Sequence, residues 1–412
     1  MNCRFCDAQL THVFLDLGCA PPSNDYLTPA DLQSPERYFP LRLFVCDSCF
    51  LVQTEDYSKA DELFRNDYAY FSSVSSSWLE HAGRYAAMIT ERLQLDGGSF
   101  VVEIASNDGY LLKNFVSAGI PCLGIEPTAG TAEAARALGI PVLQEFFGEA
   151  LATNIARDDR KADLIIGNNV FAHVPQLNDF AAGLKIALKE RGVVTLEFPH
   201  LMQLIDNNQF DTVYHEHYSY FSFHCAQQIL ARQGLTVFDV DELPTHGGSL
   251  RVYARHAEDG SRPVAPRVEE LKRKEREAGM LDLGYYSRFQ QRAERVKDEL
   301  LGFLLARKAE GKKVAAYGAA AKGNTLLNYC GVKKDLIPFV VDASPHKQGK
   351  FLPGSHIPVV SEAMLREARP DYVLILPWNI KAEIVRQLAY ARRWGARFVV
   401  AVPSLALCEE DL

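Results

Sequence analysis

Short apolar runs alternate with amphipathic stretches over two long parts of the chain. From about Tyr68 to Arg255, the runs are Phe100–Ile104, Pro121–Ile125, Leu164–Gly167 and Val193–Phe198. Nearer the C-terminus they are KKVAAYG, LIPFVVD, YVLILPW and RFVVAVP. Because buried parallel strands appear as continuous apolar runs separated by helices, each part predicts an α/β unit with a mostly parallel sheet.

The remaining stretches differ in character. Residues 1–66 are rich in Cys, Pro and Asp and show little periodic structure, and residues 256–275 (HAEDGSRPVAPRVEELKRKE) are highly charged, as in a connector. The sequence therefore predicts three domains, at residues 1–66, 67–257 and 258–412, which suits the chain length of 412. A helix should follow the connector, with an apolar face made of Phe289, Val296, Leu300, Phe303 and Leu304.

Composition and charge narrow the functional classes. The chain is 48% hydrophobic and 23% charged, and its net charge of −8 argues against nucleic acid or an anionic membrane as the main partner. The apolar runs stay below the roughly 18 residues of a membrane-spanning helix. The N-terminus, MNCRFCDAQL, lacks an apolar signal core. We therefore expect a cytoplasmic protein without a nucleic-acid or membrane partner. The sequence leaves the oligomeric state open, and a monomer is compatible with it.

Four cysteines form two Cys-x-x-Cys units, Cys3 with Cys6 and Cys46 with Cys49. Two such turns can direct four thiolates at one ion, so the spacing predicts a tetrahedral zinc site. A closed four-cysteine site leaves no open coordination position, so we expect the zinc to be structural. The alternative is a thioredoxin-like redox pair, which is disfavoured because neither unit opens a helix near a βαβ pattern. We assign no role to Cys19.

The segment FVVEIASNDGYLL (Phe100–Leu112) places a polar turn between an apolar strand and a helix expected to begin at Tyr110. Doubly wound sheets bind nucleotides at such turns. Only Gly109 remains of a dinucleotide glycine pattern, although small residues at 105 and 106 would let a ligand approach the backbone. Glu126 ends the next strand, where a carboxylate can bind both ribose hydroxyls of a nucleoside.

A nucleoside site without a pyrophosphate cradle indicates S-adenosylmethionine (SAM) rather than NAD. The third strand supports this interpretation, because it ends in two asparagines where adenine or a methionine tail would lie. The predicted SAM-binding residues are Glu103, Ala105, Ser106, Asn107, Gly109, Glu126, Pro127, Asn168 and Asn169. An NAD-type Rossmann domain is the alternative.

The segment YHEHYSY (Tyr214–Tyr220) crowds three tyrosines, two histidines and a glutamate together. Taken alone, it is typical of a polar loop or a solvated helix face. Together with the Cys-x-x-Cys pairs, the E-I-x-S-N-D-G core and the C-terminal segment GAAAKGNTLLNYCG (Gly318–Gly331), it forms a pattern of motifs that extends over the whole chain. That pattern resembles the nucleotide-sugar C-methyltransferases.

The resemblance implies SAM-dependent methylation of TDP-linked 4-keto-deoxysugars. It also implies a fold made of a small zinc domain, a central SAM-binding methyltransferase domain and a C-terminal Rossmann-like domain that helps to enclose the sugar nucleotide. Ala105 departs mildly from the pattern, because many methyltransferases carry glycine there, and it should narrow the cofactor loop.

The resemblance further implies a catalytic group made of Tyr68, His173, Tyr214, Glu216 and His217. A ketone at sugar C4 acidifies the neighbouring C–H bonds, so catalysis needs a base near neutral pKa and a donor for the enolate oxygen. We predict His217 as the base, since imidazole titrates near working pH. Glu216 either orients that ring or is itself the base, and Tyr214 and Tyr68 are candidate donors. Methylation at C3 matches the family's commonest form, and C5 is the alternative.

A second turn between strand and helix lies in AAYGAAAKGNT. It is not a P-loop, because Asn324 follows Gly323, and it lacks the pattern G-x-G-x-x-G. Small residues still let a phosphate approach the helix N-terminus, so Lys322 and Asn324 are assigned to the diphosphate of the sugar nucleotide. A tight packing turn is an equal alternative. The segment HGGSLRVY (His246–Tyr253) either shapes the wall of the substrate cleft or forms a plain turn.

The leading hypothesis is therefore a C-methyltransferase acting on a keto-sugar nucleotide. An NAD-dependent sugar-nucleotide oxidoreductase is disfavoured by the missing glycines. A zinc-bearing protein that binds a nucleotide sugar without turnover is disfavoured by the dense group of proton-handling side chains.

Overall fold

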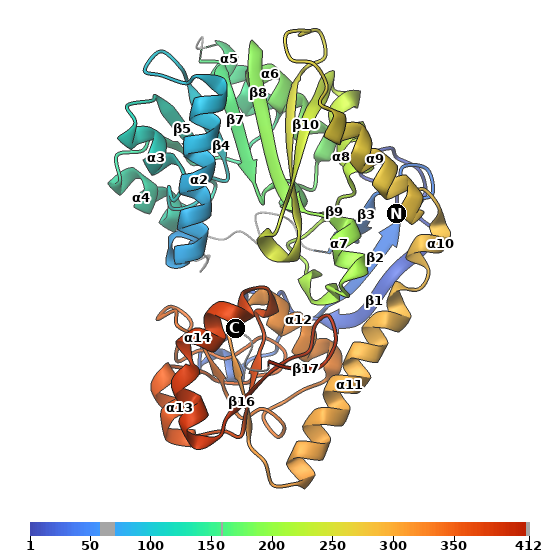
Figure 1. The fold of residues 1–412 in the computed structure, drawn as a ribbon, viewed down its shortest axis with the longest axis vertical. Coiled ribbons are helices and arrows are strands. Elements are labelled where there is room, and N and C mark those ends of the chain that lie inside the picture. The colour runs from blue at the N-terminus through green and yellow to red at the C-terminus, as the bar shows by residue number, and fades with distance from the viewer. Residues whose placement is uncertain (58–70, 158–159, 409–412) are drawn as a thin grey trace.

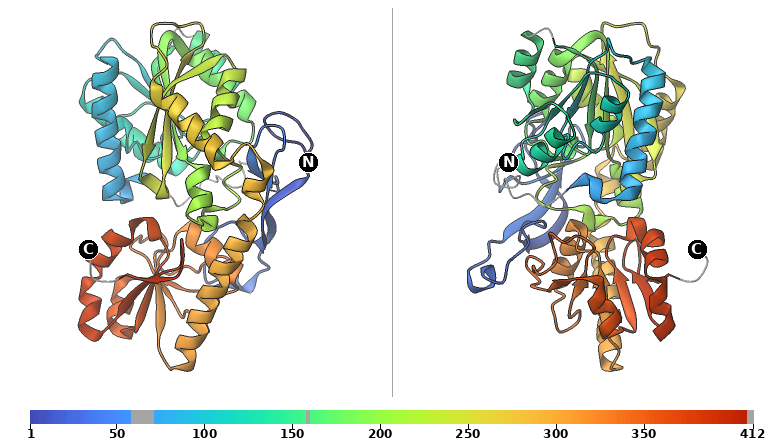
Figure 2. Two further views of the ribbon diagram at one scale, coloured as in Figure 1. Left: turned by 45° about the vertical axis from the view of Figure 1, so that its right-hand side comes forward. Right: turned by 90° about the vertical axis from the view of Figure 1, so that its left-hand side faces the viewer.

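The computed structural model describes residues 1–57, 71–157 and 160–408. The molecule is elongated, with a central sheet at one end, a C-terminal sheet at the other and the N-terminal strands beside their junction (Figure 1). Both views in Figure 2 show the same arrangement. The predicted α/β architecture is thus confirmed, while the domain boundaries after residues 66 and 257 stay predictions. In the part of the chain described, no helix has the length and apolarity to cross a membrane.

The N-terminal domain is an antiparallel sheet, so the expectation of little periodic structure there is wrong. It consists of β1 (His12–Ala20), β2 (Phe39–Val45) and β3 (Val52–Thr54), with a 3-10 turn, η1 (Asp31–Gln33), between the first two. Two register shifts between β1 and β2 break the period-two pattern that would reveal the strands in the sequence. The fourth strand, β9 (Ser219–Tyr220), belongs to the YHEHYSY segment and pairs with β3.

The central sheet has seven strands in the order β10-β11-β8-β7-β4-β5-β6. Only β11 runs antiparallel to its neighbours. The strand order reverses between β4 and β7, and doubly wound sheets bind ligands at such a point. The strands are β4 (Val101–Ile104), β5 (Cys122–Ile125), β6 (Val142–Leu143), β7 (Ala162–Asn168), β8 (Leu188–Pro199), β10 (Leu235–Leu243) and β11 (Ser249–His256).

Helices cover both faces of the central sheet (Figure 1). One buried cluster joins α2, α3 and α4 to one face, and another joins α5, α6 and α8 to the other. The helix after the first strand begins two residues later than predicted. The helices are α2 (Ser76–Leu93), α3 (Leu112–Ser117), α4 (Ala129–Ala137), α5 (Glu149–Arg157), α6 (Leu177–Ala187), α7 (Leu201–Asp206) and α8 (Phe223–Arg232). Short 3-10 turns are η2 (Ser72–Val74), η3 (Phe171–His173), η4 (Phe210–Thr212) and η5 (Thr245–Gly247).

The second half of the charged connector belongs to a helix, α9 (Pro266–Ala278). Proline at its first turn suits a helix start, and a stripe containing Val268 and Leu271 is buried. Glu275 is buried as well, because its carboxylate accepts the backbone N–H groups of Phe223 (2.5 Å) and His224 (2.8 Å) at the start of α8. The high charge density therefore hides a helix that packs on the central domain.

From α9 the chain passes through α10 (Leu283–Tyr286) to α11 (Phe289–Ala309), which lies along the C-terminal domain (Figure 1). Phe289, Val296, Leu300 and Leu304 are buried as predicted, and Phe303 is half-buried. Phe289 stacks on Phe14 of β1 with ring centroids 4.9 Å apart. The N-terminal and C-terminal domains thus share one apolar cluster.

The C-terminal sheet has the order β14-β13-β12-β15-β16-β17, parallel except for β17. One face packs against α11 and α12, and the other against α13 and α14. Its strand order also reverses, between β12 and β15. The elements are β12 (Val314–Tyr317), α12 (Ala321–Cys330), β13 (Val340–Val341), β14 (Val359–Val360), α13 (Glu362–Ala368), β15 (Tyr372–Ile375), η6 (Trp378–Ile380), α14 (Lys381–Gln387), η7 (Ala389–Trp394), β16 (Arg397–Val400) and β17 (Ala406–Leu407).

Candidate active site

The four predicted zinc ligands lie together. The Sγ atoms of Cys3, Cys6, Cys46 and Cys49 are all within 4.8 Å of one another, and two pairs of them are 3.5 Å apart. Each turn closes through its own backbone hydrogen bond of 2.9 Å. The N–H of the residue after the second cysteine donates to the carbonyl oxygen of the first cysteine. Four thiolates about 2.3 Å from a zinc ion would lie about 3.8 Å apart, so this donor set fits structural zinc. Cys19 is exposed on β1.

These zinc-binding turns rest on the central domain. The carbonyl oxygen of Phe5 accepts hydrogen bonds from Nδ2 of Asn178 on α6 (2.9 Å) and from the Arg232 guanidinium on α8 (3.0 Å). A metal ion that orders the turns would therefore also fix the N-terminal domain against these two helices.

A cavity of about 1570 Å³ lies where the carboxyl ends of the two parallel sheets face each other. The loops after β4 and β7 contribute Ala105 and Asn169, and the starts of α12 and η6, which follow β12 and β15, contribute Lys322 and Asn379. The N-terminal domain adds Asn24. Because both sheets reverse their strand order at these loops, the cavity occupies the position where α/β sheets bind ligands.

Three residues of the loop after β4 adopt the left-handed backbone conformation that favours glycine, although only one of them is a glycine. Ala105, Asn107 and Gly109 have φ angles of 56°, 50° and 78°. This left-handed region suits glycine and is tolerated by asparagine. A Cβ on Gly109 would lie 2.4 Å from Ile140 Cδ1, so that position requires glycine. Ala105 and Asn107 line the cavity, whereas Ser106 is buried against Gly124 of β5.

Glu126 braces this loop and also faces the cavity. Its carboxylate accepts the N–H groups of Asn107 and Thr128, each at 2.9 Å, and the Thr128 hydroxyl. Carboxylate oxygens can accept more than one hydrogen bond, so the group can also take ribose hydroxyls. Pro127 lines the cavity beside it. Glu103 does not line the cavity. It is fully buried, and burial together with the charge of Glu126 raises its pKa well above the usual range.

Asn168 ends β7, Asn169 follows it, and both line the cavity. Each has an Oδ1 atom that is buried and has no hydrogen-bond partner among the described residues. Buried acceptors of this kind call for a donor from a ligand. SAM carries such donors on its adenine and on its amino-acid ammonium group. These acceptors, together with Glu126, therefore fit the cofactor.

The YHEHYSY segment follows η4 along the cavity, and its last two residues form β9. The His217 ring packs against Tyr214 and His173, with centroids 4.0 and 4.7 Å away. Its Nδ1 atom is 3.1 Å from the carbonyl of Thr212, and Nδ1 of His173 is 2.9 Å from the carbonyl of Glu216. A carbonyl can only accept, so both rings carry a proton on Nδ1 and have their basic lone pair on Nε2.

Both imidazoles are neutral at physiological pH. Burial lowers the pKa of His217 well below its usual range, and repulsion from His173, His246 and Lys322 lowers it further. Burial also lowers the pKa of His173 to about 4. His217 therefore has the tautomer and the protonation state of a general base. Tyr68, the remaining member of the predicted catalytic group, lies outside the described residues.

A residue that sequence reasoning missed completes this part of the site. Nδ2 of Asn24 donates to both carboxylate oxygens of Glu216, at 2.8 and 2.9 Å. Both residues line the cavity. Asn24 lies in a proline-rich loop of the N-terminal domain, and no local pattern in the sequence links it to a segment 192 residues away.

The C-terminal wall of the cavity carries a half-buried cation, Lys322. Lys322 donates to Oδ1 of Asn379 (2.7 Å) and lies 4.8 Å from the Trp378 ring centroid. Burial lowers the pKa of Lys322, and the neighbouring Asp211 opposes that shift. The structure does not bring Asn324 to this wall. Its Nδ2 atom donates to the Ser23 carbonyl (2.6 Å) and so fastens α12 to the N-terminal domain.

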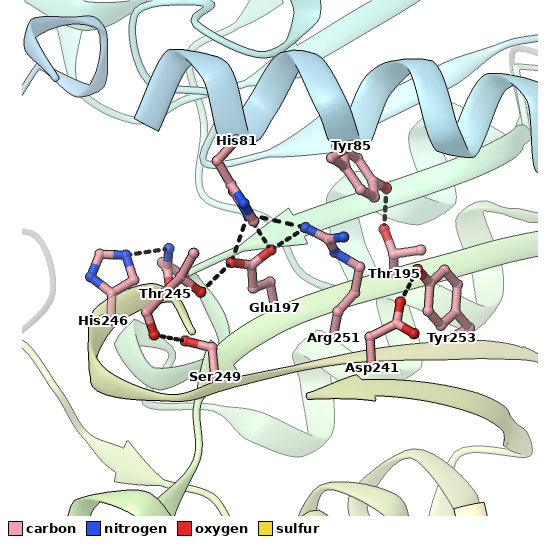
Figure 3. Close-up of polar contacts among 11 residues, drawn as sticks. His81, Tyr85, Thr195, Glu197, Asp241, Thr245, His246, Ser249, Arg251 and Tyr253 are labelled. Atoms are coloured by element: carbon pink, nitrogen blue, oxygen red, sulfur yellow. Dashed lines mark hydrogen bonds and ion pairs between the residues drawn. The ribbon is translucent and has the colours of Figure 1, made fainter. Parts of the chain in front are cut away.

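A buried polar network stands beside the cofactor end (Figure 3). Glu197 of β8 contacts His81 of α2 at 3.0 Å, Arg251 of β11 at 2.5 Å and the Thr245 hydroxyl at 3.0 Å. His81 also lines the cavity, where its ring stacks on Trp78 at 4.9 Å. Sequence reasoning missed Glu197, His81 and Trp78, because their neighbours in space come from four separate elements.

Comparisons with known proteins agree with this geometry. Family models match residues 3–64 as a zinc binding domain, 78–240 as a methyltransferase domain and 244–403 as a C-methyltransferase C-terminal domain. The C-methyltransferase NovU of Streptomyces niveus is 35% identical over 402 residues, which cover 98% of this chain and 95% of that protein. The chain belongs to the C-methyltransferases. It is a SAM-dependent enzyme with a four-cysteine zinc domain.

Two similar solved structures each cover less than half of this C-methyltransferase. Magnesium protoporphyrin IX methyltransferase from Synechocystis PCC 6803 is 14% identical, with a TM-score of 0.33, and covers 43% of this chain and 78% of its own. A SAM-dependent methyltransferase from Clostridium acetobutylicum is 12% identical, with a TM-score of 0.35, and covers 43% and 92%.

Proposed function

We propose that this C-methyltransferase acts on a nucleotide-linked 4-keto-deoxysugar and methylates the carbon beside the ketone, at C3. The observation that carries the proposal is a single cavity that brings three features together. It is lined by the cofactor loop, by the neutral base His217 and by the cation Lys322. A half-buried ammonium favours an anionic partner, and the diphosphate of a sugar nucleotide would supply one.

When bound, SAM supplies an electrophilic methyl group. His217 accepts the proton of the carbon beside the ketone at Nε2, the C–H electron pair becomes the C=C bond of an enolate, and the ketone oxygen takes the negative charge. That carbon would take up the methyl group as the S–CH3 bond of SAM breaks, S-adenosylhomocysteine would leave, and the C=O bond would be restored. His217 starts this sequence in its neutral form because its surroundings keep the pKa low.

The other cavity residues have supporting roles in this proposal. Tyr214 packs on the base and offers a hydroxyl to the enolate or the sugar. Glu216 either compensates the positive charge that His217 gains or is the base itself, and His173 shapes the other side of the ring. Glu126, Asn168 and Asn169 hold the cofactor, and Lys322 binds the diphosphate. Tyr68 is retained as a candidate donor from the matched motif.

The first test separates proton removal from methyl transfer. In heavy water, with S-adenosylhomocysteine bound, the enzyme should wash deuterium into the carbon beside the ketone of a TDP-4-keto-deoxysugar. His217→Ala should lose both exchange and methylation, whereas His12→Ala, at an exposed position of β1, should keep both. Mass spectrometry and proton NMR give the rate and the position of exchange.

Three outcomes decide between the alternatives. Exchange at C5 instead of C3 would contradict the assigned carbon. Normal exchange in His217→Ala would remove the base assignment. If Glu216→Gln loses as much as His217→Ala, the carboxylate is the base; a smaller loss means that it tunes the imidazole.

A further inference from the structure

The loop between β10 and β11 has a strained backbone at the cavity wall. His246, Gly247 and Gly248 have φ angles of 54°, 88° and 119°. A Cβ on Gly247 would lie 2.5 Å from the Trp378 ring, so the loop also touches the C-terminal domain. A left-handed backbone is unfavourable for histidine, and such strain persists only where the surroundings impose it.

Buried contacts impose this conformation (Figure 3). The Thr245 hydroxyl is held by Glu197, and Oγ of Ser249 donates to the Thr245 carbonyl at 2.9 Å. Nε2 of Gln209 donates to the Gly247 carbonyl at 2.7 Å. Glu197 is itself fixed by an ion pair with Arg251. The charged network therefore serves as the anchor of a loop that presents one side chain, His246, at the cavity.

A hydrogen bond to the His246 ring shows which ring nitrogen carries the proton. Nδ2 of Asn169 is 3.2 Å from Nε2 of His246, and because an amide nitrogen only donates, the ring proton is on Nδ1. Nδ1 points away from the network in Figure 3, and the residue lines the cavity. Burial, followed by the charge of Lys322, lowers the pKa of His246 to about 4, so the ring is a neutral donor.

This donor shares one cavity with the base and the cofactor loop. His246 accepts a hydrogen bond from Asn169, which follows β7 at the cofactor end, and His246 and His217 both line the cavity. The carbon that loses its proton must lie between His217 and the cofactor. The oxygen on the adjacent carbon therefore lies beside the same two groups.

We propose that His246 is a further catalytic residue, whose Nδ1–H donates a hydrogen bond to the substrate oxygen that becomes negatively charged when the neighbouring carbon is deprotonated. This inference rests on the function proposed above. A neutral imidazole suits the role because it stabilises an oxyanion without delivering a proton to it. The strained loop fixes the donor before the substrate arrives.

The test uses the two amide side chains that mimic the two ring nitrogens. The amide of Asn reaches the position of Nδ1 and Asn tolerates a left-handed backbone, whereas the amide of Gln reaches the position of Nε2. His246→Ala and His246→Gln should slow exchange and methylation together by about 10²-fold, the usual effect of a lost oxyanion donor. His246→Asn should stay within about 10-fold of the wild type. SAM affinity, from calorimetry, and TDP affinity should change by less than about 3-fold in all three.

The results separate the possibilities. Rescue by Gln but not by Asn would overturn the Nδ1 assignment. Normal exchange in His246→Ala, or a loss explained entirely by weaker SAM or TDP binding, would reduce His246 to a wall residue and overturn the proposal. If wild-type enzyme shows neither exchange nor methylation with the keto-sugar nucleotide, the substrate class is wrong and the inference falls with it. Thermal unfolding of each variant detects misfolding, and His246→Asn keeps the test decisive if His246→Ala does not fold.

Discussion

Burial sets the chemistry of the individual side chains around the cavity. His173, His217 and His246 are held neutral, and partial burial lowers the pKa of Lys322. A pocket with little water strengthens the electrostatic interactions of each remaining charge, because little solvent screens them. An anion bound at Lys322 would raise the low pKa of His217 and so make it a stronger base. The enzyme would thus gain its base strength when the substrate arrives.

The same histidines should make the folded state sensitive to acid. His173 has a folded-state pKa of about 4 and an unfolded value of about 6.5, so between these values the unfolded chain binds a proton that the folded chain does not. Stability is therefore lost as pH falls through this window, by about 2 kcal/mol between pH 7 and pH 5 for this residue. His173→Asn should shrink the shift in urea midpoint between these pH values. His12→Asn, at an exposed site, should not. Identical shifts in wild type and His173→Asn would contradict the neutral buried state.

Glu126 gives a second prediction at this scale. Removing its carboxylate leaves the ribose hydroxyls and two backbone N–H groups without their acceptor, so Glu126→Ala should weaken SAM binding by roughly 1–3 kcal/mol. Glu133→Ala, a change on the neighbouring helix α4, is the matched control. Calorimetry measures both. Unchanged SAM affinity in Glu126→Ala would remove this residue from the cofactor site.

Among the elements, the loop after β1 shows how one segment can join three domains. Asn24 holds Glu216 of the catalytic segment, while the Tyr26 hydroxyl donates to the Ala319 carbonyl at 2.5 Å and the Ser23 carbonyl accepts from Asn324. Hydrogen bonds from an amide to both carboxylate oxygens favour the charged form of Glu216. If Glu216 acts in catalysis as proposed, this loop connects the zinc domain to that role.

Asn24→Asp should reverse that effect. Two carboxylates at hydrogen-bond distance cannot both be ionised easily, so the pKa of Glu216 should rise and the acid limb of the exchange rate should move to higher pH. Asn24→Ala should produce a smaller shift in the same direction. The pH profiles of exchange, and ¹³C NMR of the Glu216 carboxyl assigned with Glu216→Gln, measure both. A profile identical to that of the wild type would show that Asn24 only fills space.

Elements with a simple period could be predicted from the sequence, and those with broken periods could not. The buried strands and the apolar face of α11 follow from continuous or helical spacing. Strand β1 was missed because its bulges interrupt the alternation, and α9 because its charges conceal a narrow buried stripe. The cofactor loop looked poor in glycine, yet Ala105 and Asn107 adopt the glycine conformation in the fold.

The contacts of the site that could not be predicted from the sequence are long-range contacts. The motifs predicted a zinc site and a catalytic segment, and the structure brings His173 to His217 and places Lys322 on the same cavity. The partners of these groups, such as Asn24, are polar residues in loops without any local signature. Asn324 is the opposite case. Its position in the motif predicted a phosphate ligand, but its side chain forms a hydrogen bond that joins two domains.

At the scale of the whole molecule, the zinc domain and the catalytic segment depend on each other. Strand β9 completes the N-terminal sheet two residues after His217, and the zinc-binding turns dock on α6 and α8. Zinc binding contributes about 10–16 kcal/mol to the folding of small four-ligand domains, so losing the metal should release β9 and Asn24 together. The central sheet, which carries the cofactor loop, has its own core. Metal loss should therefore damage the base more than the cofactor site.

Cys46→Ser tests this dependence. Wild-type protein should contain one zinc ion per chain by elemental analysis, and the variant should contain much less. Exchange and methylation should fall by at least about 10²-fold, in line with the loss of an ordered catalytic group, while SAM binding stays within about 10-fold. Cys19→Ser, outside the four-cysteine cluster, should keep both zinc and activity. A zinc-free Cys46→Ser enzyme with full turnover would show that β9 and Asn24 hold the catalytic segment without the metal. Equal loss of SAM binding would show instead that the central domain does not fold independently of its neighbour.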